Sequence, residues 1–425
     1  MPRCPRARPT LDAMIDSALA AVEPSKVIRH YLEANPHPET THVIGVGKAA
    51  EAMARGALER LPLPAEVIIR HGDALPDPHP EITIFEAGHP LPDAASVAAT
   101  AYLIERAHAM TSGDSVLFLL SGGASAMLAA PAASIPLSDL RTVNTQLLHS
   151  GASIDEINTV RRHLSQIKGG QLARIFHPAR VDVLVFSDSV SDNLFTIGSG
   201  PLAADPTTFR DALRVLDHYD LRAVAPESVV AYLDAGHRGD HPETVKSDDP
   251  ALVGVRHAIV SSRREAAAAA ARAASRRCWD AHAVDLNVHN DATSLGRWLV
   301  EQGLKHPSGT CLVFAGEATV AVRGDGTGGR NQETALAAAI ALDALPESIR
   351  LTVASVATDG VDGPTSAAGA VVDRETLRHA HELGLDPADF LARNDSHTFF
   401  AQLDALITTG PTRTNVNDVM VVLVE

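Results

Sequence analysis

The stretch VIGVGKAAEAMARGA, residues 43–57, indicates the fold of this chain. Its first residues are apolar and largely β-branched, which is typical of a buried strand, and its Ala-rich remainder is typical of a helix. Gly45 and Gly47 lie where the strand ends, and Lys48 opens the helix. A strand, a glycine turn and a helix in this order are characteristic of α/β proteins, which place ligands at the carboxyl ends of parallel strands.

Short β-rich runs alternate with Ala-rich helical stretches over most of the 425 residues, which predicts α/β layers with largely parallel strands. A segment at 235–252 is rich in Gly, Pro, His and Asp, lacks apolar periodicity and separates two such halves. We therefore expect one domain over residues 1–240 and a second over 250–425, with the last segment able to return to the first domain. Strands are expected at residues 41–47, 66–70, 82–87, 115–120, 181–187, 257–262, 281–287, 310–316, 319–322, 351–359 and 418–424.

Composition narrows the classes of function. Lys and Arg together number 36 and Asp and Glu 52, which gives a formal net charge of −16. A net-acidic chain without a basic stripe argues against binding to nucleic acid and against docking on anionic membranes. No run approaches the roughly 20 apolar residues that span a bilayer. The three cysteines are far apart and predict neither a disulfide framework nor a Cys-based zinc site, so we expect a cytoplasmic location.

Two glycine-rich turns that follow predicted strands are candidates for binding an anion. Lys48 lies in the first, next to Gly47, where a lysine suits the neutralisation of a phosphate or carboxylate. This turn also fits the dinucleotide pattern G-x-G-x-x-A, but the next strand ends at Arg70-His71-Gly72 and lacks the acidic residue that binds a ribose. The second turn, Ser121-Gly122-Gly123-Ala124-Ser125, combines glycines and hydroxyls before a short helix. Both patterns also occur in turns that serve packing alone.

A third segment, INTVRRHLSQIKGGQLAR at residues 157–174, carries cations beside glycines. Arg161, Arg162, Ser165 and Lys168 recur at helical spacing, and Gly169-Gly170 follow the lysine. A charged helical face is usually only solvated, whereas the glycine pair favours contact with an anion, so both interpretations stay open.

A fourth segment, at 184–209, has acidic residues directly after a predicted strand. Asp188 and Asp192 could hold Mg²⁺, which proteins usually bind through one or two carboxylates together with nucleotide phosphates. The same residues are equally typical of Asx turns and helix caps, so the sequence leaves the two roles open.

The segment AGEATVAVRGDGTGGRNQETALAAAIAL, residues 315–342, is the most specific pattern in the chain. A hairpin-like pair ends in the glycine-rich run 324–329, and Arg330-Asn331-Gln332-Glu333 starts a helix. An arginine at this place can bind a carboxylate or phosphate through two parallel hydrogen bonds. So many polar groups at one helix N-terminus are difficult to explain by packing, and we expect a binding site here.

Taken in order, these segments resemble the class II glycerate 2-kinase family, whose C-terminal part is the MOFRL domain and many of whose members have been labelled hydroxypyruvate reductase. The resemblance implies ATP- and Mg²⁺-dependent phosphorylation of D-glycerate to 2-phospho-D-glycerate. It also implies a cleft between a Rossmann-like domain and a MOFRL-type α/β domain with a mixed sheet. The chain reads Ser191-Asp192-Asn193 where members often have Gly-Asp-Asp, and Ser261-Ser262-Arg263 where they usually have SNR. The similar segments span nearly the full length: GVGKAA, EAGHPLPD, LLSGGASA, INTVRRHLSQIKGG, SGPLAADPTTF, ETVKSDDP, GEATVAVRGDGTGGRNQE, ATDGVDGP, NDSHTFF and GPTRTNVND.

The resemblance assigns the activity to Lys48 and Arg330 as catalytic residues. Phosphoryl transfer depends mainly on positioning and charge neutralisation, which two cations can supply. We hypothesise that Arg330 and Asn331 hold the glycerate carboxylate or the transferring phosphoryl group while Lys48 neutralises developing charge. The expected residues are Gly45, Gly47, Ser121, Gly122, Gly123, Ser125, Lys168, Gly169 and Gly170 for the nucleotide, Lys48, Glu317, Arg330 and Asn331 for the substrate, and Asp188 and Asp192 for the metal.

Two other functions stay open from the sequence. An NAD(P)-dependent hydroxypyruvate reductase would use the GVGKAA turn, but we can locate no acid/base pair for hydride transfer. A non-catalytic protein that binds a small anion on the same scaffold is the second, and the presence of both Lys48 and Arg330 argues against it. The general base, the nucleotide preference and the oligomeric state are left open, with a homodimer as one arrangement.

Overall fold

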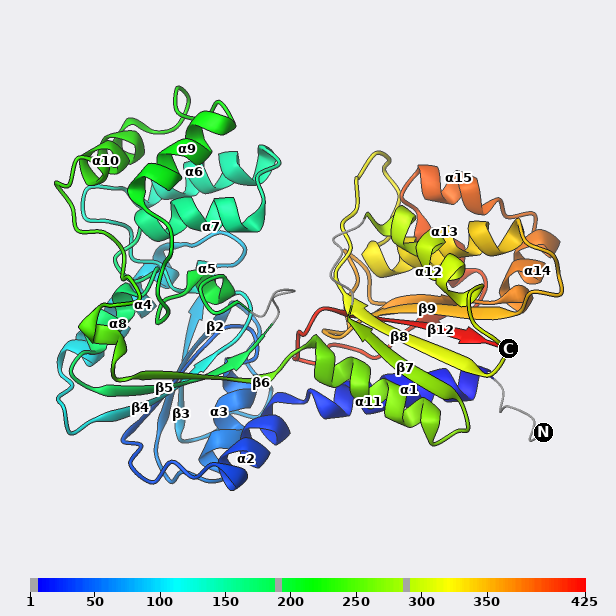
Figure 1. The fold of residues 1–425 in the computed structure, drawn as a ribbon, viewed down its shortest axis with the longest axis horizontal. Coiled ribbons are helices and arrows are strands. Elements are labelled where there is room, and N and C mark those ends of the chain that lie inside the picture. Colours follow the sequence, from blue (N-terminus) through cyan, green and yellow to red (C-terminus); the bar gives the residue numbers. More distant parts are fainter. Residues whose placement is uncertain (1–6, 188–192, 286–290) are drawn as a thin grey trace. The chain divides into compact units, whose positions relative to one another are not determined.

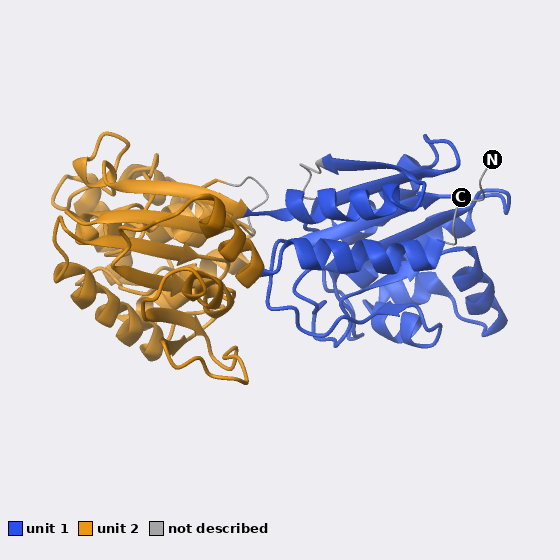
Figure 2. Cartoon of the chain, turned by 90° about the horizontal axis from the view of Figure 1, so that it is seen from below, with its two compact units in different colours: residues 1–23, 261–425 blue, residues 24–260 orange. Residues whose placement is uncertain are grey.

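The computed structural model describes residues 7–187, 193–285 and 291–425. The chain forms two compact units, coloured in Figure 2: unit 1 contains residues 1–23 and 261–425, and unit 2 contains residues 24–260. Both are α/β, which confirms the expected fold class (Figure 1). The division lies after residue 260 and not within 240–250, and it is the N-terminal segment, rather than the last one, that joins the distant unit.

Unit 2 contains a six-stranded sheet with the order β3-β2-β1-β4-β5-β6. The pairs from β3 to β5 are all parallel, and the order reverses between β1 and β4, as in Rossmann folds. The expected strands of this half are therefore present. Their bounds are β1 His42–Val46, β2 Ala65–Arg70, β3 Ile82–Ala87, β4 Ser115–Leu120, β5 Arg180–Phe186 and β6 Val255–Ser261.

Helices cover both faces of this sheet. α3 contacts β1 and β2, whereas α4 and α8 share an apolar core with the side chains of the opposite face, where Phe118 and Phe176 pack edge to face. A second apolar core joins α6, α7, α9 and α10, which form a helical layer of their own. The helices are α2 Pro24–Ala34, α3 Ala50–Leu58, α4 Ala94–His108, α5 Ala124–Met127, α6 Leu137–His149, α7 Ile154–His163, α8 Gln171–Phe176, α9 Phe209–His218 and α10 Glu227–His237.

Unit 1 contains a mixed sheet with the order β11-β10-β9-β12-β8-β7. β7 and β8 are parallel, while β12 is antiparallel to both of its neighbours, β8 and β9. The last strand therefore lies in the middle of this sheet, where it starts at the edge at which β8 and β9 end. The bounds are β7 Asp280–Asp285, β8 Thr310–Gly316, β9 Leu351–Ala357, β10 Gly369–Val372, β11 Leu406–Ile407 and β12 Asp418–Val424.

The helices of unit 1 also form two layers. α12 and α13 pack against each other and share an apolar core with the sheet. α1, from the N-terminus, packs against α11, and Trp279 Nε1 donates a hydrogen bond to Thr10 Oγ1 (3.3 Å). Among the described residues, no helix has both the length and the apolar character needed to cross a membrane. The helices are α1 Ala7–Ala21, α11 Arg263–Ser275, α12 Ala292–Gly303, α13 Arg330–Asp343, α14 Arg374–Glu382, α15 Pro387–Ala392 and α16 Ser396–Ala401.

Candidate active site

The first two glycine turns meet where the strand order of unit 2 reverses. Lys48 N donates to Gly122 O (2.9 Å) and Ala49 N donates to Ser121 Oγ (3.1 Å), so the turns after β1 and β4 are bonded to each other. Gly47 has φ 120°, and a Cβ there would lie 2.5 Å from Ser121 O, so only glycine fits. Open α/β sheets bind their ligands beside such a reversal.

The second turn offers unused donors at this place. The peptide N–H groups of residues 122–125 donate to no acceptor within the part of the chain that the structure describes. Ser125 Oγ lies 2.7 Å from Ser199 Oγ, and Ser199 in turn donates to Asn158 Oδ1 (2.9 Å), which fixes the hydroxyl at the start of α5. Such a set of N–H groups and hydroxyls is suited to binding phosphate oxygens.

Lys48 lies beside this turn. Its side chain is half-buried, and its ammonium group has no hydrogen-bond or ion-pair partner among the described residues. A Cβ on Gly123 would lie 3.3 Å from Lys48 Cγ and 3.2 Å from His89 Cδ2, so these two side chains flank the same glycine. Lys48 is therefore placed to meet a ligand at the turn.

His89 is a residue of this site that the sequence analysis did not select. Burial, together with the positive charges of Lys48 and Arg70, lowers the pKa of His89 to about 4. The imidazole is neutral at pH 7 and can accept a proton. Its position inside EAGHPLPD, one of the segments that carry the family resemblance, was the signal available in the sequence.

Three of the glycines expected to bind a nucleotide serve packing in this structure. Gly45 lies within β1, and a Cβ there would come within 3.1 Å of Val67. The N–H groups of Gly169-Gly170 donate to the carbonyl groups of residues 199–200, at 3.1 and 2.7 Å. The peptide N–H groups of Gly169 and Gly170 are thus bonded within the chain, whereas those of residues 122–125 have no acceptor among the described residues.

Lys168 is placed differently from the sequence expectation. α7 ends at His163, so Lys168 lies in a turn before α8 and does not share a helical face with Arg161. Its side chain is 6% exposed, and Nζ donates to Ser125 O (2.7 Å) and Leu128 O (2.8 Å). Burial and then the charge of Arg161 lower the pKa of Lys168 to about 7. Lys168 therefore supports α5, the helix behind the second turn.

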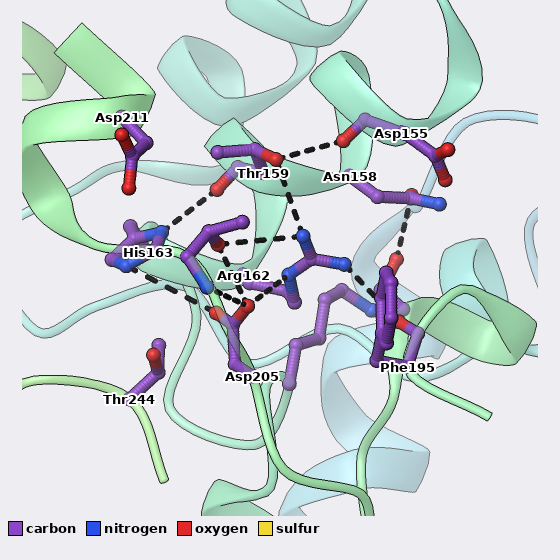
Figure 3. Close-up of polar contacts among 12 residues, drawn as sticks. Asp155, Asn158, Thr159, Arg162, His163, Phe195, Asp205, Asp211 and Thr244 are labelled. Carbon is purple, nitrogen blue, oxygen red and sulfur yellow. Dashed lines mark hydrogen bonds and ion pairs between the residues drawn. The ribbon is translucent and has the colours of Figure 1, made fainter. Parts of the chain in front are cut away.

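Arg162 belongs to a buried network and not to a solvated face. Figure 3 shows its guanidinium between Asp205, with Nε 3.0 Å from Oδ1, and the carbonyl oxygen of Phe195, which accepts from Nη1 at 3.1 Å. His163 donates to Thr159 O (2.8 Å) and lies 4.0 Å from the second oxygen of Asp205. The network joins α7 to the chain on either side of residues 197–200, which adjoin the glycine pair.

In unit 1, Arg330 forms a two-pronged ion pair. Its Nε and Nη2 donate to the two carboxylate oxygens of Asp418 at 2.6 and 2.7 Å, and Glu317 lies 3.6 Å away. Burial disfavours the charge, but Asp418, followed by Glu317 and Asp362, outweighs it and raises the pKa of Arg330. Asp418 is the first residue of β12 and was missed because the sequence shows it only as the last letter of GPTRTNVND. Nη1 has no partner among the described residues, so one edge of the guanidinium can bind a ligand.

The N-terminus of α13 is already occupied by a carboxylate of the protein. Asp362, which is fully buried, accepts from the peptide N–H groups of Asn331 and Gln332 at 3.0 and 2.9 Å and from both side-chain amides. Asn331 Oδ1 accepts from Ser355 Oγ (2.6 Å). Asn331, expected to bind substrate, is buried with both ends of its amide partnered, so it positions the start of the helix in this structure.

The glycine-rich run 324–329 is also explained by packing, contrary to the expectation. The peptide N–H groups of Arg323 and Gly324 donate to Asn394 Oδ1, at 2.7 and 3.0 Å, and Thr327 N donates to Asp395 Oδ1 (3.1 Å). A Cβ on Gly326 would lie 2.5 Å from Asp395 Cβ. The run lies against the NDSHTFF segment, and glycine is needed because the two segments approach closely.

The expected metal ligands, Asp188 and Asp192, lie outside the described residues. Across the described ranges, no cluster of three or more His, Cys, Asp or Glu side chains could hold a metal ion. In unit 1 the two most buried carboxylates, Asp362 and Asp418, are engaged by α13 and Arg330. The described residues therefore assign no metal site.

The chain is a two-unit α/β protein: one unit has a Rossmann-type sheet with Lys48 at its reversal point, and the other has a mixed sheet with an ion pair between Arg330 and the buried Asp418. Residues 10–234 match a family described as "Domain of unknown function (DUF4147)", and residues 310–418 match the MOFRL family. D-glycerate 2-kinase of Thermotoga maritima is 36% identical, with 97% of each chain covered, and Glycerate 2-kinase of Pyrococcus horikoshii is 37% identical, with 90% of this chain and 87% of that one covered. The crystal structure of glycerate kinase from Thermotoga maritima superposes with a TM-score of 0.87 at 35% identity, over 99% of this chain and all of that one. The chain belongs to the class II glycerate kinase family.

Proposed function

We propose that the protein transfers the γ-phosphoryl group of ATP to the 2-hydroxyl of D-glycerate, giving 2-phospho-D-glycerate and ADP. The observation that carries the proposal is the unpaired ammonium of Lys48 beside unused peptide donors at the reversal of a Rossmann sheet. Relatives named as glycerate 2-kinases, similar over nearly the whole chain, support the same activity.

The proposed roles follow from the charge that develops in phosphoryl transfer. Peptide N–H groups of residues 122–125 and the hydroxyl of Ser125 bind phosphate oxygens, and Lys48 neutralises charge on the transferring group. His89, neutral and beside Lys48, is the candidate to accept the proton of the attacking hydroxyl. Arg330 remains the second catalytic cation, held in one orientation by Asp418, with Nη1 left for the substrate.

The proposed reaction uses ATP together with Mg²⁺. Asp188 and Asp192 remain the residues expected from the sequence to hold it, and it would supply positive charge that offsets the negative charge of the phosphates. A cytoplasmic location is likewise proposed from composition.

The experiment that tests the function is ³¹P NMR of the product formed from D-glycerate and MgATP. A new monoester resonance identical to that of 2-phosphoglycerate, together with ADP, is expected. Formation of 3-phosphoglycerate would correct the position of attack. Loss of absorbance at 340 nm with NAD(P)H and hydroxypyruvate, without ADP from glycerate, would establish the reductase instead.

A further inference from the structure

A small pocket in unit 2 is lined by two cations and, within the described part of the chain, by no carboxylate. It has a volume of about 20 Å³ and lies among the end of α5, the prolines of the GHPLP segment, α6 and the turn before α8. Arg161 and Lys168 both line it, together with Asn144 and Ser165. Its remaining walls are Ser125 and apolar residues, namely prolines, alanines and leucines. The pocket thus places the two cationic side chains, Arg161 and Lys168, against largely apolar walls.

Neither cation has an acidic partner among the residues that the structure describes. Lys168 Nζ donates to two carbonyl oxygens, Ser125 O and Leu128 O, which leaves one of its three N–H bonds without an acceptor. Arg161 donates from Nε to Asn144 Oδ1 (3.0 Å), and its terminal nitrogens have no acceptor among residues 7–187, 193–285 and 291–425. No ion pair is formed by either side chain within those ranges.

Two neighbouring arginines of the same unit differ from Arg161 in having acidic partners. Arg162, one position further along α7, is buried against Asp205, and Arg174 on α8 is paired with Asp249. Two like charges near each other in a dry environment destabilise the fold, and Arg161 contributes to the lowered pKa of Lys168. A protein retains such a pair where a ligand supplies the missing negative charge.

We propose that Arg161 and Lys168 bind one anionic group, a carboxylate or a phosphate, of a substrate. The inference rests on the proposed function for the identity of that substrate. The volume admits one or two oxygen atoms and excludes a nucleoside, so only the end of a ligand enters. The planar guanidinium of Arg161, oriented by Asn144, offers two parallel donors to such a group, and Ser165 lines the same pocket. The pocket adjoins the turn at residues 122–125, since Ser125 lines it and Lys168 Nζ donates to Ser125 O as well as to Leu128 O.

The test compares Arg161→Gln with Arg141→Gln, which removes the same charge from an exposed arginine on the neighbouring helix α6 that has no partner among the described residues. Dissociation constants for D-glycerate and for ADP are measured separately by isothermal titration calorimetry at pH 7. We expect Arg161→Gln to weaken one of the two ligands at least ten-fold and the control to change neither by more than two-fold. Weaker binding of D-glycerate would identify the group in the pocket as a carboxylate, and weaker binding of ADP would identify it as a phosphate. Values within two-fold of the parent for both ligands would overturn the proposal.

Arg161→Lys guards against a purely structural effect. It keeps the charge, and we expect it to recover at least half of the lost binding free energy at an unchanged unfolding midpoint. If both variants bind D-glycerate and ADP more weakly to the same extent, and both have a lowered unfolding midpoint, Arg161 only supports the fold. If the parent binds neither ligand, the proposed function fails. Inorganic phosphate then tests the pocket alone, and it should raise the unfolding midpoint of the parent and not of Arg161→Gln.

Discussion

Lys48 is the residue on which the proposed activity depends most directly. The sequence could place it after a strand, because a β-rich run followed by glycines and an Ala-rich helix is a local pattern. Its meeting with the turn at residues 121–125 is also predictable, since β1 and β4 are neighbours in any sheet of the Rossmann order. The roles of His89 and Asp418 were not predictable from local pattern, because each depends on neighbours far away in the sequence.

Replacing Lys48 by methionine should reduce turnover without unfolding the protein. The ammonium has no partner among the described residues, so its loss should change the free energy of unfolding by no more than about 0.5 kcal/mol. Loss of a charge that stabilises the transition state should lower kcat by about 100-fold to 1,000-fold. Steady-state kinetics and thermal unfolding of Lys48→Met measure both, with the exposed Lys305→Met as the control. A kcat within three-fold of the parent would remove Lys48 from the mechanism.

Lys168 should make stability depend on pH. In the folded protein its pKa is about 7, and its ordinary value is 10.5, so between these values the unfolded chain binds more protons. The free energy of unfolding should therefore rise with pH in this window, by about 3 kcal/mol between pH 7 and 9.5. Lys168→Met should lack this rise. Urea unfolding at the two pH values tests it, and an equal rise in parent and variant would contradict it.

At the scale of elements, α13 shows why a helix N-terminus is hard to interpret from sequence. Arg330-Asn331-Gln332-Glu333 was expected to bind a ligand, but Asp362 from the loop after β9 takes the donors. Residues 319–322 were expected to be a strand and instead contain only an isolated bridge at Thr319. In both places the deciding partner comes from another part of the chain, and a local pattern does not record it.

Asp362→Asn should destabilise α13 and with it the position of Arg330. The carboxylate accepts four hydrogen bonds from residues 331 and 332, and an amide would place N–H groups against N–H groups. Leaving these buried donors unsatisfied should lower the free energy of unfolding by about 3 kcal/mol. Asp359→Asn, in the same loop, keeps an amide oxygen that can accept the single bond from Val361 N, and it should cost less than about 1 kcal/mol. Denaturant unfolding of the two variants gives the comparison, and equal losses would show that Asp362 is not a special cap.

At the scale of the whole molecule, the composition and the alternation of strands and helices were sufficient to predict two α/β units. They were not sufficient to predict the boundary between the units. The polar segment 235–252 resembles a linker, but the chain continues into β6, which completes the sheet of unit 2. The assignment of α1 to unit 1 depends on contacts across about 270 to 300 residues, such as that between Met14 and Cys311. No periodicity in the sequence records a pairing at that distance.

α1 belongs to unit 1 although the next residues in the sequence belong to unit 2. We therefore expect the substitution of a buried residue of α1 to destabilise unit 1 alone. Met14 is fully buried, and Met14→Ala should lower the stability of unit 1 by about 2 to 5 kcal/mol. Asp12→Ala, on the exposed side of the same helix, should have little effect. Limited proteolysis with identification of the cut sites separates the units. We expect Met14→Ala to accelerate cleavage within residues 261–425 and to leave residues 24–260 as resistant as in the parent. Equal acceleration in both ranges would mean that the two units unfold as one, and that α1 stabilises the whole chain.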